Sequence, residues 1–492
     1  MTSSDLPVIV AGGGPSGLAA ALMLKRHGFR NVIVIEKRSE ESFQEAVAYT
    51  YLINGRGQRL TDLLDLTGTI AQVGIGLSEV KELHEFTADG KLNVKKTFRP
   101  PSACENYFIP RDRLLDIFRR KVEGFNANCN AGDQIKILFN TSIQAIDCMQ
   151  DGVLSVKLQC IADKGADPQV MLTNFLIGCD GVHSMTRKYL EQHRGVKTTQ
   201  LTSPAVGLRF KMLKLKADPN LPNYSADKFY TIVNNGNSSF NRFRLTFFPV
   251  RDLKDPRRPL IRTCANVCSP MHELWNQKSL LEIKELFHRR FPQLNVSEFF
   301  ADEELERFAN DRGGVFPPIQ YVDKVYGVFS GSDSTSCIVI LGDAAHCFPP
   351  DMGAGVNAAM EDVFRLHVAL DQSPNDIPEA LLNFERSAVP ENKALCELLQ
   401  FAFPYQYRQS IVMFYVNLMK MGFRSVLARI APMLFSPSAF GMALNHTTPY
   451  SEVLRRAHAT TRNIYLLVGG LCSAAAILLL RDKLQKIIRL SI

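Results

Sequence analysis

Apolar and polar positions in the first 36 residues predict a strand, a helix and a second strand. The apolar run from Val8 to Ala11 is followed by a helical pattern from Leu18 to Arg26, which Gly28 is placed to end. A second apolar run, Val32 to Ile35, comes next and stops at Glu36. Short β-branched strands on either side of a helix are typical of a βαβ unit in a parallel sheet.

Three later apolar runs, at 135–139, 153–158 and 170–177, are separated by turns and predict a β-meander packed against the first sheet. Before them, residues 75–108 are irregular or strand-like, with Pro100-Pro101 as a break, and a helix then starts within 108–115.

The second half of the chain begins with strands and ends with helices. Residues 200–320 are strand-rich with one helical stretch around Leu280 to Phe291, and they predict a separate sheet domain. A buried strand then delivers Asp343 at its carboxyl end, and a helix begins near Gly355. From Pro374 onward the pattern is helical almost to the end of the chain.

Three glycines between the first strand and the first helix, Gly12, Gly14 and Gly17, have the spacing Gly-x-Gly-x-x-Gly. Glycine at these positions allows a tight turn, a close approach of the backbone to a pyrophosphate, and close packing of helix on strand. The helix N-terminus then offers free N–H groups to the phosphates. Glu36 is placed to accept the 2′-hydroxyl of an adenosine ribose, and its charge disfavours a 2′-phosphate. The loop therefore predicts FAD or NAD rather than NADP.

A second glycine-containing stretch, residues 54–60, is not expected to bind phosphate, because no strand of sufficient length feeds it and Leu60 occupies the last glycine position. The chain thus holds one dinucleotide fingerprint, whereas a pyridine-nucleotide disulfide reductase needs two and a redox cysteine pair. The 11 cysteines are scattered and never spaced as Cys-x-x-Cys. We therefore expect neither a disulfide framework nor a metal site, and favour a reducing compartment.

The net charge of +8 is concentrated at the end of the chain. Residues 452–492 carry seven basic and two acidic side chains, which is +5 of the total, so the body is nearly neutral and nucleic acid is not an expected partner. These charges flank an apolar segment, which points to a membrane surface.

Ile464 to Leu480 is an uninterrupted run without a charge, between Arg462 and Arg481. At about 1.5 Å per residue it spans roughly 25 Å, which is workable for a bilayer core of about 30 Å. We expect a tail anchor here, rather than a buried core helix. The stretch 411–435, with basic residues interleaved, could lie along the membrane surface, but core packing is the favoured prediction. The first strand begins by Val8, which leaves no room for a cleavable signal.

Two further motifs follow the glycine loop: Asp-Gly-x-x-Ser-x-x-Arg from Asp180 to Arg187, and Gly-Asp-Ala-Ala-His from Gly342 to His346. In this order the three motifs resemble the class A flavoprotein monooxygenases, the family of the single-component aromatic hydroxylases. The resemblance covers most of the chain, and the set of three is far more specific than any one motif.

The resemblance implies an α/β fold: an FAD-binding Rossmann-like (GR2-type) domain with an inserted β-sheet substrate domain, C-terminal helices and a tail-anchor transmembrane helix. We expect the FAD-binding domain to comprise residues 1–74, 105–195 and 325–373, the substrate domain 75–104 and 196–324, the helical region 374–450 and the transmembrane helix 464–480.

The family's chemistry implies that NADPH or NADH, binding transiently as co-substrate, reduces FAD, that O2 adds at flavin C4a, and that the hydroperoxyflavin hydroxylates a small aromatic substrate. Two alternatives stay open: a more apolar substrate, as in quinone- or sterol-pathway hydroxylases, and a non-catalytic membrane-tethered module that keeps FAD for structure. The catalytic domain is expected in the cytosol, on the mitochondrial outer membrane rather than the endoplasmic reticulum.

Site residues are predicted from residue chemistry and from the resemblance together. Asp343 can bond the ribityl chain or the pyrophosphate, and the helix near Gly355 directs its positive end at the flavin ring, which is anionic when reduced. His346 is expected to be structural. No catalytic side chain is predicted; the expected flavin-facing loop contains Pro349, Gly353 and Gly355. The expected cofactor-binding residues are Gly12, Gly14, Ser16, Gly17, Glu36, Lys37, Arg38, Arg111, Asp180, Asp343, Gly355, Val356 and Asn357.

The substrate pocket departs from the pattern of family members that hydroxylate an aromatic amino acid. Those enzymes hold the carboxylate with an arginine and a tyrosine of the substrate sheet and with polar residues of the C-terminal helices. Here the stretch 74–105 offers Lys81 near the arginine position and no match for the tyrosine, and the helices offer Phe-Ala-Phe at 401–403 and Ala-Phe at 439–440. A buried carboxylate without partners would cost several kcal/mol, so these residues favour a more apolar aromatic substrate.

Overall fold

The computed structural model describes residues 6–41, 49–87, 89–96, 104–163, 165, 167–216, 228–234, 243–251 and 260–490. The break predicted at Pro100-Pro101 lies outside these residues.

The first half of the fold is built on a six-stranded sheet. Its strands, in spatial order, are β20 (Tyr326–Ser330), β21 (Thr335–Ile340), β12 (Phe175–Gly178), β1 (Val8–Ala11), β2 (Val32–Ile35) and β8 (Ile135–Leu138). All neighbours are parallel except β20 and β21. The predicted βαβ unit is confirmed, with α1 (Pro15–Arg26) between β1 and β2.

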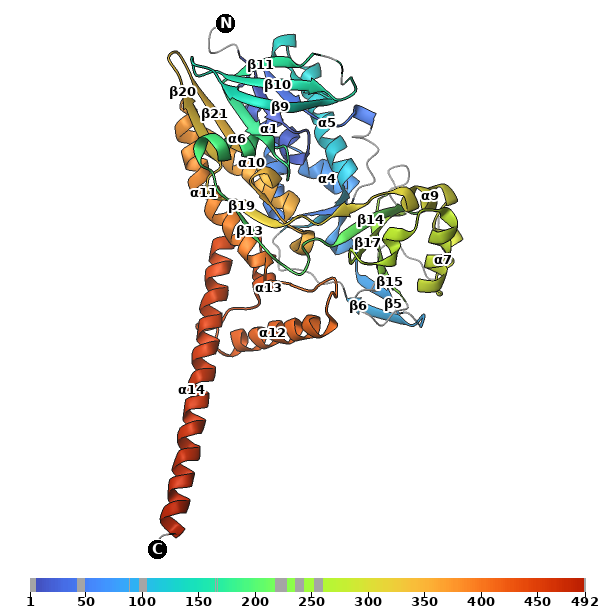
Figure 1. Cartoon of the computed structure of the whole chain (residues 1–492), viewed down its shortest axis with the longest axis vertical. Helices are drawn as coiled ribbons and strands as arrows, with labels where there is room; N and C mark the ends of the chain where they lie inside the picture. Colours follow the sequence, from blue (N-terminus) through green and yellow to red (C-terminus); the bar gives the residue numbers. More distant parts are fainter. Residues whose placement is uncertain are drawn as a thin grey trace.

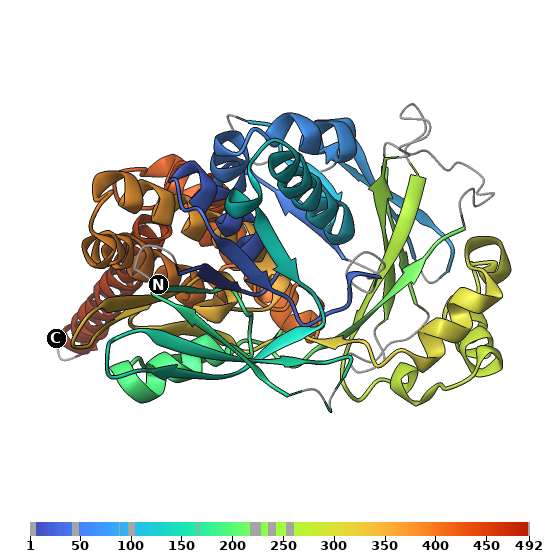
Figure 2. The same ribbon diagram turned by 90° about the horizontal axis from the view of Figure 1, so that it is seen from above.

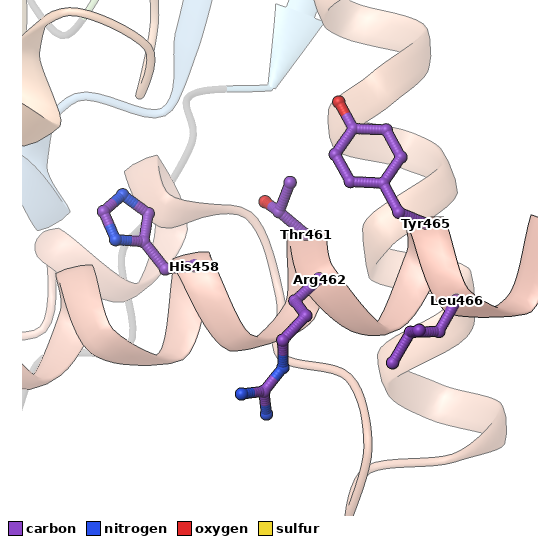
Figure 3. Close-up of a pocket in the computed structure, with 5 residues that line it drawn as sticks. All are labelled: His458, Thr461, Arg462, Tyr465 and Leu466. Atoms are coloured by element: carbon purple, nitrogen blue, oxygen red, sulfur yellow. The ribbon is translucent and has the colours of Figure 1, made fainter.

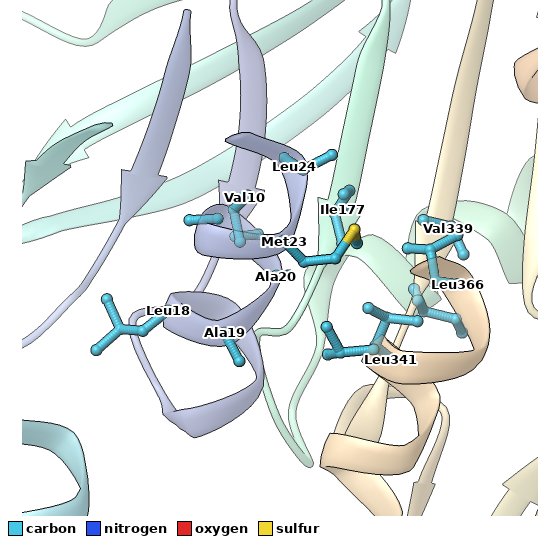
Figure 4. Close-up of a cluster of buried hydrophobic side chains, with 14 of the residues drawn as sticks. Val10, Leu18, Ala19, Ala20, Met23, Leu24, Ile177, Val339, Leu341 and Leu366 are labelled. Atoms are coloured by element: carbon cyan, nitrogen blue, oxygen red, sulfur yellow. The ribbon is translucent and has the colours of Figure 1, made fainter. Parts of the chain in front are cut away.

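The core of this sheet is apolar on both faces, as parallel strands require. Val10, Ile177 and Val339 of three adjacent strands pack against Ala20 of α1 and Leu366 of α10 (Gly355–Gln372) in one cluster (Figure 4). The helix predicted near Gly355 is therefore confirmed. Since the carboxyl ends of parallel strands share one edge, β1, β2, β12 and β21 deliver their following residues to the same place.

The meander prediction for 135–177 is wrong at both ends. Only β9 (Thr141–Cys148), β10 (Leu154–Cys160) and β11 (Gln169–Thr173) form an antiparallel sheet, whereas β8 and β12 belong to the parallel sheet. The run 170–177 changes sheet at Asn174: β11 alternates exposed and less exposed residues, whereas β12 is buried throughout. Residues buried on both faces favour the parallel sheet.

A seven-stranded sheet forms the second layer. Its strands, in spatial order, are β18 (Gly314–Val315), β14 (Arg209–Lys214), β17 (Leu260–Cys268), β16 (Arg244–Val250), β15 (Lys228–Val233), β5 (Glu82–Phe86) and β6 (Leu92–Lys96). Two of its strands thus come from the 75–108 stretch. Where one helix was predicted, three cover its outer face: α7 (Leu280–Arg290), α8 (Val296–Phe299) and α9 (Asp302–Asn310) (Figures 1 and 2).

The two faces of β16 have different environments. Leu245 and Phe247 pack with the helices in one apolar cluster. Because side chains alternate along a strand, Arg244, Thr246 and Phe248 lie on the opposite, inner face.

Two small sheets and four further helices complete the part of the body that the structure describes. The sheets are β3 (Thr50–Ile53), β7 (Tyr107–Pro110) and β4 (Ile75–Gly76), and β13 (Thr198–Leu201), β19 (Ile319–Val322) and β22 (His346–Cys347). The helices are α3 (Gly55–Leu63), α4 (Thr67–Val73), α5 (Arg111–Ala127) and α6 (Met185–Arg194).

The stretch 54–60 differs from its prediction in one respect. A strand does precede it, since β3 is as long as β1, but β3 belongs to an antiparallel sheet. Gly55 and Gly57 then lie within α3, where a Cβ would come within 2.5 Å of His446 and 2.6 Å of Asn357 Oδ1, respectively. These two glycines therefore serve close packing.

The C-terminal half is helical, as predicted, with α11 (Ile377–Leu399), α12 (Ile411–Ile430), α13 (Ala439–Ala443) and α14 (Tyr450–Leu490). Helix α14 extends far out of the body in Figure 1 and contains the whole predicted anchor segment. Its base is tied to the body by Arg56, whose guanidinium lies 3.9 Å from the ring centre of Tyr450, and by Glu391, which accepts from the Tyr450 backbone N–H at 2.6 Å.

The prediction that the stretch 411–435 packs in the core is wrong for most of its length. Helix α12 has no buried residue, and Met433 beyond it is almost fully exposed. The exposed residues include apolar side chains that the pattern assigned to a core. Helices α12 and α14 are the two in the described chain that are long and apolar enough to cross a membrane.

Candidate functional site

The glycine loop joins β1 to α1 at the edge where the parallel strands end. Gly12 has a φ of +99°, and a Cβ on it would lie 2.3 Å from the carbonyl oxygen of Cys179. A Cβ on Gly17 would lie 1.8 Å from the carbonyl oxygen of Gly12. A Cβ on Gly14, in contrast, would meet nothing within 4 Å. Gly12 and Gly17 are thus fixed by protein contacts, whereas Gly14 borders the open space that a phosphate needs.

Glu36 follows β2 and lies beside this loop. Its Oε2 accepts the backbone N–H of Gly13 at 2.8 Å, and its Oε1 accepts both the backbone N–H and the Nε–H of Arg38, at 2.9 and 3.0 Å. Burial acts to raise the pKa of Glu36, but the hydrogen bonds and charge of Arg38 lower it overall. The carboxylate is therefore held in its charged form. Lys37 is exposed.

Asp180 follows β12 and is adjacent to the loop through Cys179. Its Oδ2 accepts the backbone N–H groups of Met185 and Thr186 at 2.8 and 3.1 Å, which stabilises the start of α6. Its Oδ1 is buried without a hydrogen-bond partner in the described part of the chain. Arg187 donates to the carbonyl oxygens of Ala344 and Val182 at 2.9 and 2.7 Å, and so joins the second motif to the third.

Asp343 lies in a short 3-10 helix (Gly342–Ala344) after β21. Its side chain is exposed, yet desolvation raises its pKa, while the charges of His346 and Arg111 oppose the shift. From an exposed side chain in a desolvated setting we infer that the carboxylate of Asp343 lines an internal cavity. Arg111 also interacts electrostatically with Tyr51 and with Glu36. Arg111 is thus within electrostatic range of both Glu36 and Asp343.

His346 has a structural place, as expected. Its Nε2 lies 2.7 Å from Oδ2 of Asp362, and both side chains are buried. Asp362 also accepts the backbone N–H of Gly342 at 2.9 Å. This pair fixes the Gly-Asp-Ala-Ala-His turn against α10.

The predicted flavin-facing loop runs from Pro349 to the start of α10. Gly353 has a φ of +60°, which favours glycine, and a Cβ on it or on Gly355 would meet no atom closer than 4.0 Å. The first N–H groups of α10, at Gly355, Val356 and Asn357, have no hydrogen-bond partner among the described residues. They are available to a ligand.

The Asn357 side chain is engaged within the protein. Its Oδ1 accepts the backbone N–H of Asn54 at 2.9 Å, and its Nδ2 donates to the carbonyl oxygens of Leu52 and Gly353 at 2.8 and 3.1 Å. The backbone N–H of Asn357 is therefore the group of this residue that is left for a cofactor.

These features fit an extended FAD. Four features follow one another along the edge of the sheet. They are the open space at Gly14, the unpartnered Oδ1 of Asp180, the cavity-facing carboxylate of Asp343 and the free N–H groups of α10. The unpartnered oxygen counts most, because a buried acceptor without a partner costs roughly 1–3 kcal/mol unless a ligand supplies a donor.

Three residues near this space have no signal in the sequence. Asp351 lies in a short 3-10 helix (Pro350–Met352) of the flavin-facing loop, and Tyr407 and Gln406 lie beside it. Tyr407 is also close to Arg244 on the inner face of the seven-stranded sheet. These contacts join segments far apart in the chain, and no motif marks them.

Burial raises the pKa of Asp351 from 3.8 to about 7. Because the folded protein then holds this proton more tightly than the unfolded chain, the free energy of unfolding falls as the pH rises from about 4 to about 7, by at most about 4 kcal/mol. We expect Asp351→Asn to lose less thermal stability than the parent protein between pH 5 and pH 8. Thermal denaturation at both values measures this, with the exposed Asp333→Asn as control; equal losses in parent and Asp351→Asn would contradict it.

The positions at which the resemblance places the carboxylate contacts hold an exposed lysine and packed phenylalanines here. Lys81 is exposed, and Phe403 packs on Phe440 with ring centres 5.0 Å apart. The inner face of the sheet offers a different cation, Arg244.

Comparison with known proteins matches the chain over most of its length. The model of the FAD binding domain family matches residues 5–260 and 335–387. Kynurenine 3-monooxygenase of Salinispora arenicola is 23% identical, over 96% of both chains. The same enzyme of Sus scrofa is 24% identical over 81% of this chain and 76% of its own. The FAD-dependent monooxygenase notI of an Aspergillus species is 23% identical, over 80% of this chain and 83% of its own.

Solved structures share the fold. 2-Methyl-3-hydroxypyridine-5-carboxylic acid oxygenase superposes with a TM-score of 0.57 at 19% identity, over 80% of this chain and 90% of its own. A mutant of PqsL from P. aeruginosa with four substitutions gives a TM-score of 0.55 at 19% identity, over 84% of this chain and 99% of its own.

Proposed function

Since the chain belongs to the FAD binding domain family and, within it, to the class A flavoprotein monooxygenases, we propose that it hydroxylates a small aromatic substrate with O2 and NAD(P)H. It is an FAD-dependent monooxygenase of the aromatic hydroxylase type. The observation that carries the proposal is the set of unsatisfied groups at one sheet edge, from Gly14 past Asp180 and Asp343 to α10.

The residues of the loop, of β2 and of β12 hold the adenosine end of FAD in this proposal. Gly14 and Ser16 would line the pyrophosphate at the start of α1, and Glu36 would accept the ribose hydroxyl. Arg38 keeps that carboxylate charged. The free Oδ1 of Asp180 would accept a hydrogen bond from a hydroxyl group of the cofactor.

The other end of the cofactor would lie between Asp343, Arg111 and α10. When bound, FAD supplies the redox chemistry of the reaction, hydride acceptance and activation of O2. The free N–H groups of Gly355 and Val356 form the positive end of α10, and they would stabilise negative charge on a flavin ring bound there. Gly353 and Gly355 would let the backbone approach the ring closely, because they have no side chain.

The substrate side of the proposal centres on Arg244. Its side chain is half-buried on the inner face of the sheet, and burial together with the charge of Arg408 lowers its pKa. The nearby carboxylate of Glu85 is paired with two other cations: its Oε2 lies 3.7 Å from Nη2 of Arg408, and its Oε1 lies 3.4 Å from Nζ of Lys95. Arg244 has no ion pair in the part of the chain that the structure describes. An arginine in this setting lacks a counterion, so we propose that the aromatic substrate carries a carboxylate or another anionic group. This weakens the expectation of a purely apolar substrate.

Arg244→Met should raise the KM for an anionic aromatic substrate about 30-fold, because a charge-assisted hydrogen bond contributes roughly 2 kcal/mol. We expect kcat to change much less, since the arginine binds a part of the substrate that does not react. Steady-state NADPH consumption measures both constants. Arg209→Met is the control, because Arg209 stacks on Trp275 outside the cavity; equal effects of the two changes would contradict the role of Arg244.

The C-terminal helix supports a further part of the proposal. Helix α14 carries the uncharged run at 464–480, and the segment from Ile464 onward makes little contact with the body. We propose that it is a transmembrane tail anchor and that the catalytic body stays on the cytosolic side. The mitochondrial outer membrane remains the preferred location and the endoplasmic reticulum the alternative.

A substrate screen on purified full-length protein tests the function. The chain should carry FAD through purification and should consume NADPH faster with an aromatic carboxylate, kynurenine being the first compound to try. FAD that binds without any ligand raising NADPH consumption above background would favour a non-catalytic flavoprotein.

A further inference from the structure

Helix α12 carries a continuous apolar stripe that no part of the described protein covers. Its members recur every three or four residues, which places them on one face of a helix. They are Val412, Tyr415, Met419, Phe423, Val426 and Ile430, and each of these residues is between 51 and 75% exposed. Met433 and Leu434 continue the exposed surface beyond the helix. A contiguous patch of this kind marks an interaction surface on a soluble body.

The other side of α12 is fixed to the protein. Phe414 packs near Phe403, with ring centres 6.5 Å apart. Arg424 hydrogen-bonds Thr461 of α14, and Asn463 of α14 donates to the carbonyl oxygen of Leu434 at 2.7 Å. The stripe is therefore held in a defined orientation relative to α14.

Both ends of α12 return to the body, which argues against a second membrane span. The chain enters the helix from Tyr407, next to the flavin-facing loop, and leaves it at Phe435, which is buried. The Ser436 backbone N–H then donates to Thr460 at 2.8 Å. A spanning helix of 20 residues would put its two ends about 30 Å apart on opposite sides of a bilayer.

The charge around α12 is of one sign. Residues 398–451 contain no aspartate or glutamate, but they contain Arg408, Lys420, Arg424 and Arg429. At about 100° per residue, Lys420 and Arg429 fall on opposite sides of the apolar stripe. An apolar face bordered by basic residues suits the boundary between anionic lipid headgroups and acyl chains.

Helices α12 and α14 lie crosswise, with α12 near the point where α14 leaves the body (Figure 1). A largely apolar pocket of about 460 Å³ opens on α14 at this level, lined by His458, Thr461, Arg462, Tyr465 and Leu466 (Figure 3). If α14 crosses a bilayer, a helix set crosswise to it lies in the plane of the membrane surface.

We propose that α12 is an interfacial helix that embeds its apolar stripe in the cytosolic leaflet and seats the catalytic body on the membrane. The inference rests on the proposed anchor in α14, because the apolar stripe of α12 would extend the membrane-contacting surface of that anchor. Since Tyr407 connects α12 to the flavin-facing loop, the seated body has that loop on its membrane side.

Tryptophan quenching by brominated lipids tests this in the full chain. The protein has a single tryptophan, Trp275, which donates to the carbonyl oxygen of Ser269 in the sheet domain and serves as an internal reference. Phe423→Trp reports the stripe, Leu471→Trp the anchor, and Phe414→Trp the protein-facing side of α12. Each variant is placed in vesicles of phosphatidylcholine and phosphatidylserine, with and without bromine on the phosphatidylcholine chains.

We expect Phe423→Trp and Leu471→Trp to lose roughly half of their added emission in brominated vesicles, and Phe414→Trp and the parent protein to lose little. Quenching of Leu471→Trp without quenching of Phe423→Trp would overturn the role of α12 and leave the anchor intact. A stripe that is covered by a second copy of the protein would give this same result. Absence of quenching in both would overturn the anchor and the inference together.

Discussion

Gly17→Ala is expected to yield protein without FAD. A Cβ at this position would lie 1.8 Å from the carbonyl oxygen of Gly12, so β1 and α1 would have to separate. That separation opens the core between the first helix and the sheet and removes the close approach on which phosphate binding depends. The flavin absorbance of the purified protein and its thermal unfolding measure the result.

Two neighbouring glycines make matched controls. At Gly28, φ is +78° and a Cβ meets nothing within 4 Å, so Gly28→Ala should cost about 1 kcal/mol and retain FAD. At Gly14 the space is open, so Gly14→Ala should keep the fold and weaken FAD binding only. Full FAD occupancy in Gly17→Ala would contradict the geometry of the loop.

Asp343→Asn should raise the Kd for FAD about 100-fold. The carboxylate faces the internal cavity, where a hydrogen bond to a charged acceptor contributes about 1.5–3 kcal/mol and water is partly excluded. Titration of the flavin-free protein with FAD, followed by flavin fluorescence, measures the change.

Asp333→Asn is the control for Asp343→Asn. Asp333 is exposed in the turn between β20 and β21, away from the edge that carries the motifs. Its substitution should leave the Kd for FAD unchanged. A Kd that is the same for all three proteins would mean that Asp343 does not contact the cofactor.

The sequence was most informative where one short stretch both determines the local secondary structure and carries a cofactor-binding motif. The run from Val8 to Glu36 defines strand, turn, helix and strand within one short stretch, and the structure contains each of them. The family and FAD followed from three such motifs, and both are confirmed. Local signals suffice here because each motif lies at the carboxyl end of a strand in one parallel sheet.

The errors arose where the same local pattern fits two environments. The run 170–177 is apolar enough for one strand, but the chain changes sheet at Asn174. Helix α12 has the apolar content of a core helix, and only tertiary structure shows that its stripe is left exposed.

The substrate side could not be predicted for a related reason. Arg244 comes from a sheet strand, Asp351 from a loop and Tyr407 from the turn segment between α11 and α12. These segments are distant in the chain, and each residue is ordinary in its own neighbourhood. Their proximity depends on how the two sheets and the C-terminal helices pack, which no local pattern encodes.

Anaerobic reduction of the bound flavin by NADPH tests the central claim most directly. The full chain, with its FAD, is mixed with NADPH in the presence and absence of an aromatic carboxylate, and the visible flavin absorbance is followed. We predict that the absorbance bleaches, faster with the carboxylate present, and returns when O2 is admitted. A flavin that stays oxidised with NADPH and with NADH, whatever ligand is added, would contradict the assignment as a monooxygenase.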